Sequence, residues 1–409
     1  MTEKFCFDFL RLAVGGCSSF PSEITDGDWH ALFEFCKRQA LIGVGFFAVE
    51  RLHVRGVECP KALRMRWYAL VSRIEKRNDL LNEQCRALAG QYAHDGLSTC
   101  VLKGQGNLLN YPDELRGRRQ SGDIDVWCLP AHGELRIAVQ TGKGAVDYSV
   151  YRGRRAVIEY VLMRRRLAGS AGKPIIRYHH IEAPLTDNTE VEVHFRPGYV
   201  HSPLRNRSMQ RWFDAQADVC MNNKTHLGFA VPTSSVNVVY QMTHLFTHYF
   251  DEGVGLRQLT DYYFALKTWH NDSMDKNDLQ SQGLWTEGLG VHIMSREEVM
   301  RTLKSFGMCK FAAAVMWVLH EVFALPAHYY ICPPDARRGR ELLDEIMRGG
   351  NFGMYDERGA WMKNGGTVGH GIWKLRRVMR LLRSYPEEAL CEPIFRVYHL
   401  FWRITHNYC

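Results

Sequence analysis

The sequence predicts an α+β fold in which a short segment with strands lies between two helical regions. Three observations predict it. In the first quarter of the chain, apolar residues recur at helical spacing and no strand-like alternation is present. Short β-rich runs begin at Leu97, and helical spacing returns after Pro197-Gly198. We therefore expect a helical region over 1–96, an α/β core over 97–200 and a second helical region over 201–409.

Length and composition indicate a folded protein of ordinary character. Of the 409 residues, 46% are hydrophobic and 23% are charged, which excludes an intrinsically disordered chain. The balance of 52 basic against 44 acidic residues gives a net charge of +8. That charge helps to attract phosphates, but over this length it is too dilute to indicate a dedicated nucleic-acid binder.

Cysteine spacing and the absence of long apolar runs predict a cytoplasmic protein. The twelve cysteines stand singly with no CxxC pair, and no secretory signal follows Met1, so we expect reduced thiols. The most apolar stretches, 40–49 and 311–327, are too short or too interrupted to span a membrane. They predict buried helices and no transmembrane segment.

The first helical region ends in one long helix. Helical spacing of Trp29, Leu32, Phe33 and Cys36 indicates a bundle, and Pro60 offers a boundary before a helix over 61–94. The Asp95-Gly96 pair then stops that helix.

The central segment alternates strands with a helix. We expect strands over 98–102 and 123–128, a helix over 155–167, and two further strands over 175–184 and 190–195. Because residues 185–189 form a good hairpin connection, the last two strands should pair antiparallel.

The second helical region contains several clear periodic segments, over 236–249, 255–268, 297–307, 310–325 and 336–347, and two last helices split by Tyr385-Pro386. The polar stretch 270–282 predicts a loop. On two of these helices, residues four apart invite a functional interpretation: His244 with His248, and Arg257 with Asp261. We favour packing for the histidines over metal binding, and a helix salt bridge for Arg257 and Asp261 over a substrate clamp.

Two carboxylates in the segment Ser121 to Val126 are the main chemical signal. Asp123 and Asp125 follow the small turn residue Gly122 and stand two positions apart. In a strand they point to one face with Cα atoms about 6.6 Å apart, so they can share a divalent ion. Carboxylate oxygens are the ligands that hard Mg²⁺, or Mn²⁺ in its place, prefers.

A third acid is expected from the strand that ends at Phe195. Val191, Val193 and Phe195 alternate with polar residues, which places Glu192 on the polar face. Glu190 shares that face and competes for the role. His194 could orient a phosphate, act as a base or accept a hydrogen bond in the core.

Basic and glycine residues upstream of the acids suit phosphate binding. Lys103 and Gly104 end an apolar stretch as a strand that turns into a helix beside a phosphate would, and Gln105 follows them. The Lys103 ammonium could pair with a triphosphate or with the acids. Among the arginines that precede the acids, Arg119 is the nearest and is our preferred contact for leaving pyrophosphate.

These motifs resemble the uncharacterised bacterial nucleotidyltransferase family of the DNA polymerase beta superfamily. The residues that carry the resemblance are Leu102-Lys103-Gly104, Tyr111-Pro112, Arg119, Gly122-Asp123-Ile124-Asp125 and Glu192-Val193-His194-Phe195. The resemblance covers about 97–197 and implies a small mixed sheet as a nucleotidyltransferase core. It assigns Gly104 to the family's turn, Asp123 and Asp125 to the metal pair and Glu192 to the third acid.

Two residues depart from the superfamily's pattern. Gln105 stands where a serine or glycine usually follows the glycine of the turn, and the third acid is Glu192 rather than an aspartate. The first departure affects the usual triphosphate contact and leaves Gly106 or Asn107 as substitutes.

The resemblance implies a Mg²⁺-dependent enzyme that transfers a nucleoside monophosphate from a nucleoside triphosphate, such as ATP, to an acceptor with release of pyrophosphate. Lys103, Gly104, Gln105, Arg119, Gly122 and His194 would bind substrate phosphates. The acceptor, a small molecule, protein or RNA, and the oligomeric state stay open. One alternative is a catalytically degenerate fold that binds a nucleotide or a partner. Another is a nucleic-acid-binding helical protein that uses the basic face over 376–383.

Overall fold

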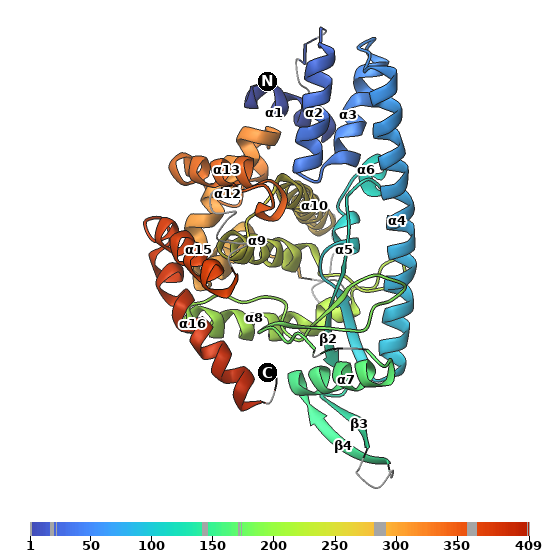
Figure 1. Cartoon of the computed structure of the whole chain (residues 1–409), viewed down its shortest axis with the longest axis vertical. Coiled ribbons are helices and arrows are strands. Elements are labelled where there is room, and N and C mark those ends of the chain that lie inside the picture. The colour runs from blue at the N-terminus through green and yellow to red at the C-terminus, as the bar shows by residue number, and fades with distance from the viewer. Residues whose placement is uncertain are drawn as a thin grey trace.

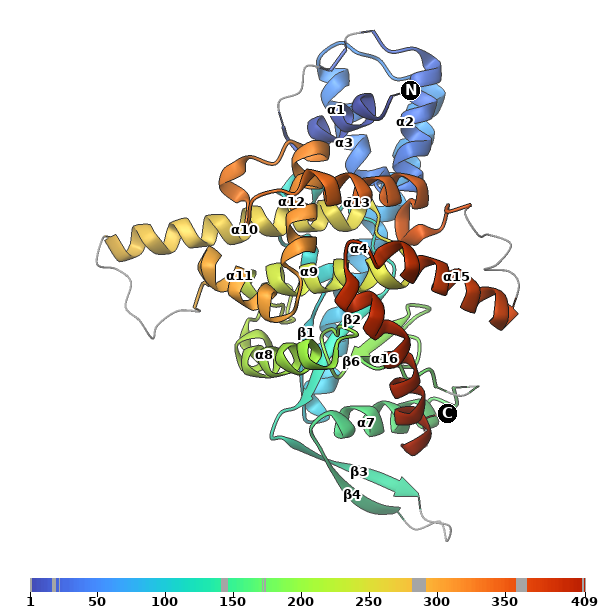
Figure 2. The ribbon, with the colours of Figure 1, turned by 90° about the vertical axis from the view of Figure 1, so that its left-hand side faces the viewer.

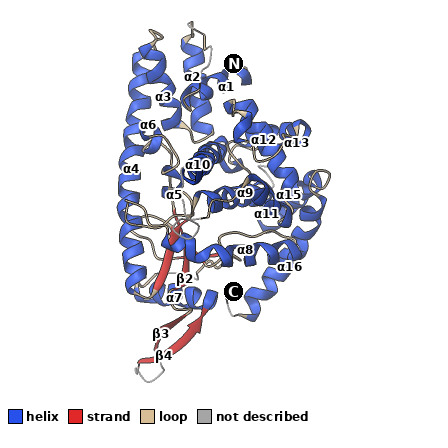
Figure 3. Ribbon diagram, turned by 180° about the vertical axis from the view of Figure 1, so that it is seen from behind, coloured by secondary structure: helices blue, strands red, loops and turns tan. Residues whose placement is uncertain are grey.

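The computed structural model describes residues 2–16, 20–21, 23–140, 146–170, 172, 174–281, 292–357, 366–406 and 408. Helices dominate, and a small sheet lies among them (Figure 3). The predicted α+β fold class, with helices around a small mixed sheet, is confirmed.

The first helical region is α1 (Glu3–Ala13), α2 (Asp26–Arg38), α3 (Ile42–Val54) and α4 (Lys61–His94). Thr25 and Asp28 form a capping box that fixes the start of α2. Helix α4 runs along one edge of the molecule, from these helices to the sheet (Figure 1). The predicted long helix is confirmed, and it reaches from the first helices to strand β1 (Leu97–Val101) of the central segment.

The sheet has four strands in the order β1-β2-β6-β5, with β1 at Leu97–Val101, β2 at Ile124–Pro130, β5 at His180–Glu182 and β6 at Val191–His194. Strand β2 pairs parallel with β6, whereas β1 pairs antiparallel with β2 and β5 antiparallel with β6. The expected mixed sheet is therefore present. Its two central strands are the ones that carry the predicted acids.

The β5–β6 pair confirms the predicted antiparallel connection, but β5 is shorter than expected. Only three residues of the predicted strand 175–184 are in β5, with an isolated bridge between Ile176 and Ile181 beside it. The turn closes through paired backbone hydrogen bonds between Thr186 and Thr189. Asp187 and Asn188 adopt φ of 46° and 63°, a region that these short polar residues tolerate.

A tight turn and two one-turn helices, α5 (Gln105–Leu108) and α6 (Asp113–Arg116), connect β1 to β2. Gly104 begins this connection with φ of 58°, which favours glycine. A Cβ on Gly106 would lie 2.6 Å from the carbonyl oxygen of Val101, so α5 packs against the end of β1 at a distance that only glycine permits.

A hairpin escaped the sequence prediction. Strands β3 (Glu134–Gln140) and β4 (Val146–Arg152) form a separate two-stranded sheet that projects from one end of the molecule (Figure 1). Helix α7 (Gly153–Leu167), which was predicted over 155–167, packs on β2 and on this hairpin.

The second helical region is α8 (Pro203–Asn222), α9 (Ser234–Asp251), α10 (Leu256–Ser281), α11 (Arg296–Ser305), α12 (Cys309–Phe323), α13 (Ala336–Gly349), α15 (Gly366–Leu381) and α16 (Pro386–Thr405), with the 3₁₀ turns η1 (Ala327–Tyr329) and η2 (Asn351–Gly353). The loop predicted over 270–282 is wrong up to Ser281, where α10 continues and projects from the body (Figure 2). That stretch is polar but contains no proline or glycine before Ser281, so nothing in it stops a solvated helix. Residue 282 lies outside the described residues.

Two hydrophobic clusters organise the core. The larger one joins α1, α2 and α3 to α9, α10 and α12, and the smaller one packs α4 and α7 against the sheet. Strands β1 and β2 contribute side chains to both clusters, so the sheet lies between them. The ten cysteines in the described ranges are free thiols, as predicted. Among the described helices, none combines the length and apolar character needed to cross a membrane.

Candidate functional site

Two of the predicted acids face each other across the centre of the sheet. Asp125 on β2 is the register partner of Glu192 on β6. Asp123 lies just before β2 and two residues from Asp125, so its side chain emerges on the same side. Asp125 is fully buried, whereas the side chain of Asp123 is 42% exposed. The site therefore has a buried end at Asp125 and an open end at Asp123.

Lys103 links the two aspartates. Its Nζ lies 3.0 Å from Asp125 Oδ1 and 3.8 Å from Asp123 Oδ2. Burial by itself lowers the pKa of Lys103, but the carboxylates of Asp125, Asp123 and Glu192 outweigh it and raise the pKa above the ordinary value. Lys103 is therefore a permanent cation in this site.

His194 joins the same cluster from β6. Its Nε2 lies 3.0 Å from Asp125 Oδ1 and 3.5 Å from Glu192 Oε2. Burial lowers the pKa of His194, but hydrogen bonds with Asp125 and Glu192 raise it further, to a net value of about 8. Burial likewise raises the pKa of Glu192, yet the hydrogen bond with His194 and the charge of Lys103 bring it down to about 2. Near neutral pH, Glu192 is thus ionised and His194 is largely protonated.

Hydrogen bonds with α4 hold both the turn at Gly104-Gln105 and the segment at Gly122 in place. The Gln105 side-chain amide donates to the carbonyl of Asn78 at 3.1 Å and to Asn82 Oδ1 at 2.8 Å, so it is directed to α4. The carbonyl of Gly122 accepts a hydrogen bond from Arg77, also on α4, at 3.2 Å. Gly104 lines a small cavity beside the acids. The phosphate-binding role of these three residues stays a prediction.

Arg119 lies near the acids but is already paired. Its Nε and Nη2 each donate to one carboxylate oxygen of Asp261 at 2.7 Å, and both side chains are buried. The hydroxyl of Tyr111 donates to the same carboxylate at 2.6 Å. The predicted salt bridge between Arg257 and Asp261 is therefore wrong. Arg257 instead donates to the carbonyl of Gln120 at 2.7 Å.

Three cations surround a narrow recess beside Asp123. The recess of about 20 Å³ is lined by Lys103, Arg119 and Arg257, among others. Burial and the nearby charge of Arg119 lower the pKa of Arg257 to about 10, which leaves it positively charged at neutral pH. Among the described residues no acid forms an ion pair with Arg257, so it is the most available charge here for a phosphate.

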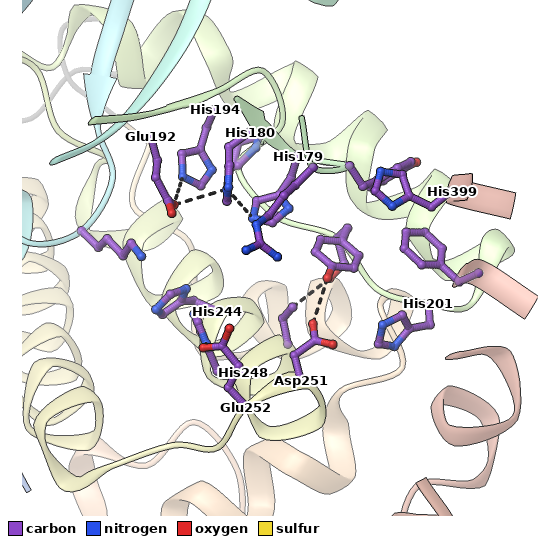
Figure 4. Close-up of a pocket in the computed structure, with 18 of the residues that line it drawn as sticks. His179, His180, Glu192, His194, His201, His244, His248, Asp251, Glu252 and His399 are labelled. Atoms are coloured by element: carbon purple, nitrogen blue, oxygen red, sulfur yellow. Dashed lines mark hydrogen bonds and ion pairs between the residues drawn. The ribbon is translucent and has the colours of Figure 1, made fainter. Parts of the chain in front are cut away.

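A larger cavity of about 350 Å³ adjoins this recess and shares Lys103, Asp123 and His244 with it (Figure 4). Lys103, Asp123, Glu192 and His194 reach it from the sheet. Histidines gather around it from several elements: His179, His180, His201, His244, His248 and His399. Of the histidines that line the cavity, the sequence analysis singled out only His194, His244 and His248. The adjacent pair His179-His180 was the one local signal available for the others.

His179 and His180 are neutral in this environment. Burial and the neighbouring imidazole of His194 lower the pKa of His180 to about 2. Burial and the rings of His180 and His194 also hold the pKa of His179 well below its usual range. His179 and His180 thus contribute uncharged imidazoles to the cavity wall, beside the largely protonated His194.

The acid cluster fits a divalent cation. Asp125 and Glu192 each offer a carboxylate oxygen, and these atoms lie within 4.8 Å of each other and of a nitrogen of His194. Asp125 Oδ2 is buried and has no hydrogen-bond partner within the described part of the chain. A buried carboxylate oxygen without a partner is costly, and a hard cation such as Mg²⁺ would satisfy it.

No curated protein and no solved structure matched the sequence. A family model described as "Uncharacterised nucleotidyltransferase" matches residues 25–283, which is more than half of the chain. That match contains the acids, Lys103, Arg119 and the strands that bring them together. The chain therefore belongs to this uncharacterised nucleotidyltransferase family.

Proposed function

We propose that the chain transfers a nucleoside monophosphate from a nucleoside triphosphate to an acceptor, with pyrophosphate leaving, and that Mg²⁺ or Mn²⁺ supports the reaction. The observation that carries the proposal is the register of Asp125 against Glu192, with Asp123 two residues away. Nucleotidyl transfer requires acids that converge beside a phosphate site, and adjacent parallel strands supply them here.

Asp123, Asp125 and Glu192 would hold the divalent cation. When bound, such an ion neutralises phosphate charge and polarises the reacting oxygens. Asp125 is fixed by Lys103 and His194, so its orientation is set before substrate arrives. Asp123 is the exposed member and is the acid that an incoming triphosphate would meet first.

The chain's own cations would receive the phosphates. Lys103 and Arg257 line the recess next to Asp123 and carry positive charge. Arg119, bound by Asp261, would act by shaping this recess and would contribute a reduced net charge. Gly104 and Gly122, which have no side chain, would let a phosphate reach the backbone, and His194 would hold the acids in place.

The acceptor would enter the larger cavity, which adjoins the phosphate recess. This cavity reaches Glu192, whose carboxylate is ionised at neutral pH and can accept a hydrogen bond from an acceptor hydroxyl. Its volume of about 350 Å³ suits a small molecule or the tip of a protein or RNA chain.

The orientation of Gln105 favours a second candidate function, nucleotide or partner binding without chemistry. In this alternative the turn no longer contacts a triphosphate, because the Gln105 amide is directed to Asn78 and Asn82.

Incubation with each labelled nucleoside triphosphate and cell extract distinguishes nucleotidyl transfer from binding without chemistry. Transfer predicts a labelled product with the wild type and none with the double variant Asp123→Asn/Asp125→Asn. Triphosphate binding without any labelled product, across protein, RNA and small-molecule acceptors, would support the binding function and contradict transfer.

A further inference from the structure

Three histidines form a compact group on one wall of the larger cavity, next to the acids (Figure 4). The ring centroids of His179 and His180 are 4.4 Å apart, and each lies 5.2 Å from the ring of His194. Each ring offers a nitrogen within 4.8 Å of the other two. Strand pairing creates the group, because His180 on β5 is the register partner of His194 on β6.

Distances between neighbouring donor atoms match those around a tetrahedral ion. His179 Nε2 lies 3.1 Å from His180 Nδ1, which lies 3.3 Å from Glu192 Oε2. A tetrahedral zinc ion with bonds of about 2.0–2.1 Å to nitrogen holds its ligand atoms about 3.3 Å apart. The His179–His180 spacing therefore needs little adjustment to accept such an ion, and a nitrogen of His194 lies within 4.8 Å of both.

Each of the three rings also keeps one buried nitrogen without a hydrogen-bond partner within the described ranges: Nδ1 of His179, Nε2 of His180 and Nδ1 of His194. Buried polar atoms are rarely left unsatisfied in folded proteins. The ion would be bound through His179 Nε2 and His180 Nδ1, which lie 3.1 Å apart, so the unpartnered nitrogens of these two rings are the ones left for water.

The chemistry of the donors selects the ion. Imidazole nitrogen favours zinc, cobalt, nickel and related transition ions, whereas Mg²⁺ favours carboxylates, phosphates and water. The acids at Asp123 and Asp125 thus suit a hard ion, and the three imidazoles suit a softer one.

We infer that His179, His180 and His194 form a binding site for one transition-metal ion of the zinc class, beside the carboxylate site. The inference does not depend on nucleotidyl transfer. Three protein ligands leave a fourth position, and sites of this composition bind water or substrate there. Here that position would face the larger cavity, where it could hold an oxygen of an acceptor.

Cobalt binding tests the site directly. After chelator treatment, the full chain is titrated with Co²⁺, whose tetrahedral complexes absorb in the visible range, and Zn²⁺ is then added as a competitor. We expect one ion per chain, displaced by Zn²⁺ and unaffected by excess Mg²⁺. The absence of stoichiometric Co²⁺ and Zn²⁺ binding to the wild type would overturn the inference.

Variants locate the ion. His179→Ala and His180→Ala should each weaken Co²⁺ binding at least about tenfold, since even residues that only support a metal ligand change affinity by about 10–100-fold. His399→Ala is the matched control, because it removes a histidine of the same cavity outside the group. Asp123→Asn should retain Co²⁺ binding even if it loses triphosphate binding, which separates this site from the proposed function.

A measurement on the wild type tests the metal site even if the histidine variants fail to fold. X-ray absorption of the zinc-loaded chain should show imidazole nitrogen as the main ligand type. Coordination by oxygen alone, or equal Co²⁺ affinity in His180→Ala and His399→Ala, would contradict the site.

Discussion

Asp125 and Glu192 are register partners on the two parallel strands at the centre of the sheet, although their residue numbers differ by 67. Asp125 is completely buried, and Lys103 Nζ lies 3.0 Å from its carboxylate. The negative charge of a buried carboxylate is stable only when cationic neighbours compensate it. The pairing of β2 with β6 is therefore what turns two separate sequence motifs into one site.

The buried pair Arg119–Asp261 should be a major contributor to stability. Substituting one partner leaves the other charge buried and uncompensated, which typically destabilises a protein by about 3–5 kcal/mol. We expect Arg119→Ala to lower the free energy of unfolding by about that amount in urea denaturation. The exposed pair Arg337–Glu341 is the control. Arg337→Ala should change the free energy of unfolding by less than about 0.5 kcal/mol. Equal effects would show that Arg119 and Asp261 do not act as a buried pair.

Two glycine-to-alanine substitutions should change the stability of the chain in opposite directions. A Cβ at Gly106 would lie 2.6 Å from the Val101 carbonyl, so Gly106→Ala should destabilise the chain by about 1–3 kcal/mol. A Cβ at Gly90, within α4, would meet nothing within 4 Å, and Gly90→Ala should stabilise it by about 0.5–1 kcal/mol. Thermal unfolding of both variants measures this. A neutral Gly106→Ala would mean that α5 does not pack closely on β1.

Stability should depend on pH through His201 and Glu388, which connect α16 to the segment before α8. Burial lowers the pKa of His201, but the hydrogen bond with Glu388 at 2.9 Å outweighs it, and the net pKa is raised above the usual 6.5. The raised pKa stabilises the folded state fully below pH 6.5, and this contribution is lost as pH rises through the folded pKa.

The comparison of wild type with His201→Gln in urea, from pH 5 to pH 9, measures this contribution. The difference in unfolding free energy should be largest at low pH and should shrink as pH rises. His226→Gln, at an exposed position, is the control and should show no such trend. A difference that grows with pH would contradict the raised pKa of His201.

Local signals were enough to predict the elements that carry the site. The Pro60 and Gly96 boundaries delimit α4, and alternation of apolar residues identifies β6, so Asp123, Asp125 and Glu192 could be selected before the structure was known. Leu135 and Ile137 alternate with Glu134 and Arg136 in β3, yet the β3–β4 hairpin was not predicted.

Contacts between distant segments could not be predicted. Asp261 pairs with Arg119 across 142 positions, and the i,i+4 spacing with Arg257 gave the wrong partner because a bidentate buried contact outweighs a helix-surface pair. His179 and His180 lie at a strand edge with no periodicity. Only the pairing of β5 with β6 brings them to His194.

The central claim is that Asp125 and Glu192 form a divalent-ion site for a nucleoside triphosphate. Calorimetric titration with a triphosphate, with and without Mg²⁺, tests it most directly on wild type, Asp125→Asn, Glu192→Gln and Glu190→Gln. Glu190 is an exposed acid two residues from Glu192, so its variant controls for charge alone. We predict Mg²⁺-dependent binding in the wild type and in Glu190→Gln, weakened at least about tenfold in the other two. Absence of Mg²⁺-dependent binding in the wild type, or unchanged binding in Asp125→Asn, would contradict the claim.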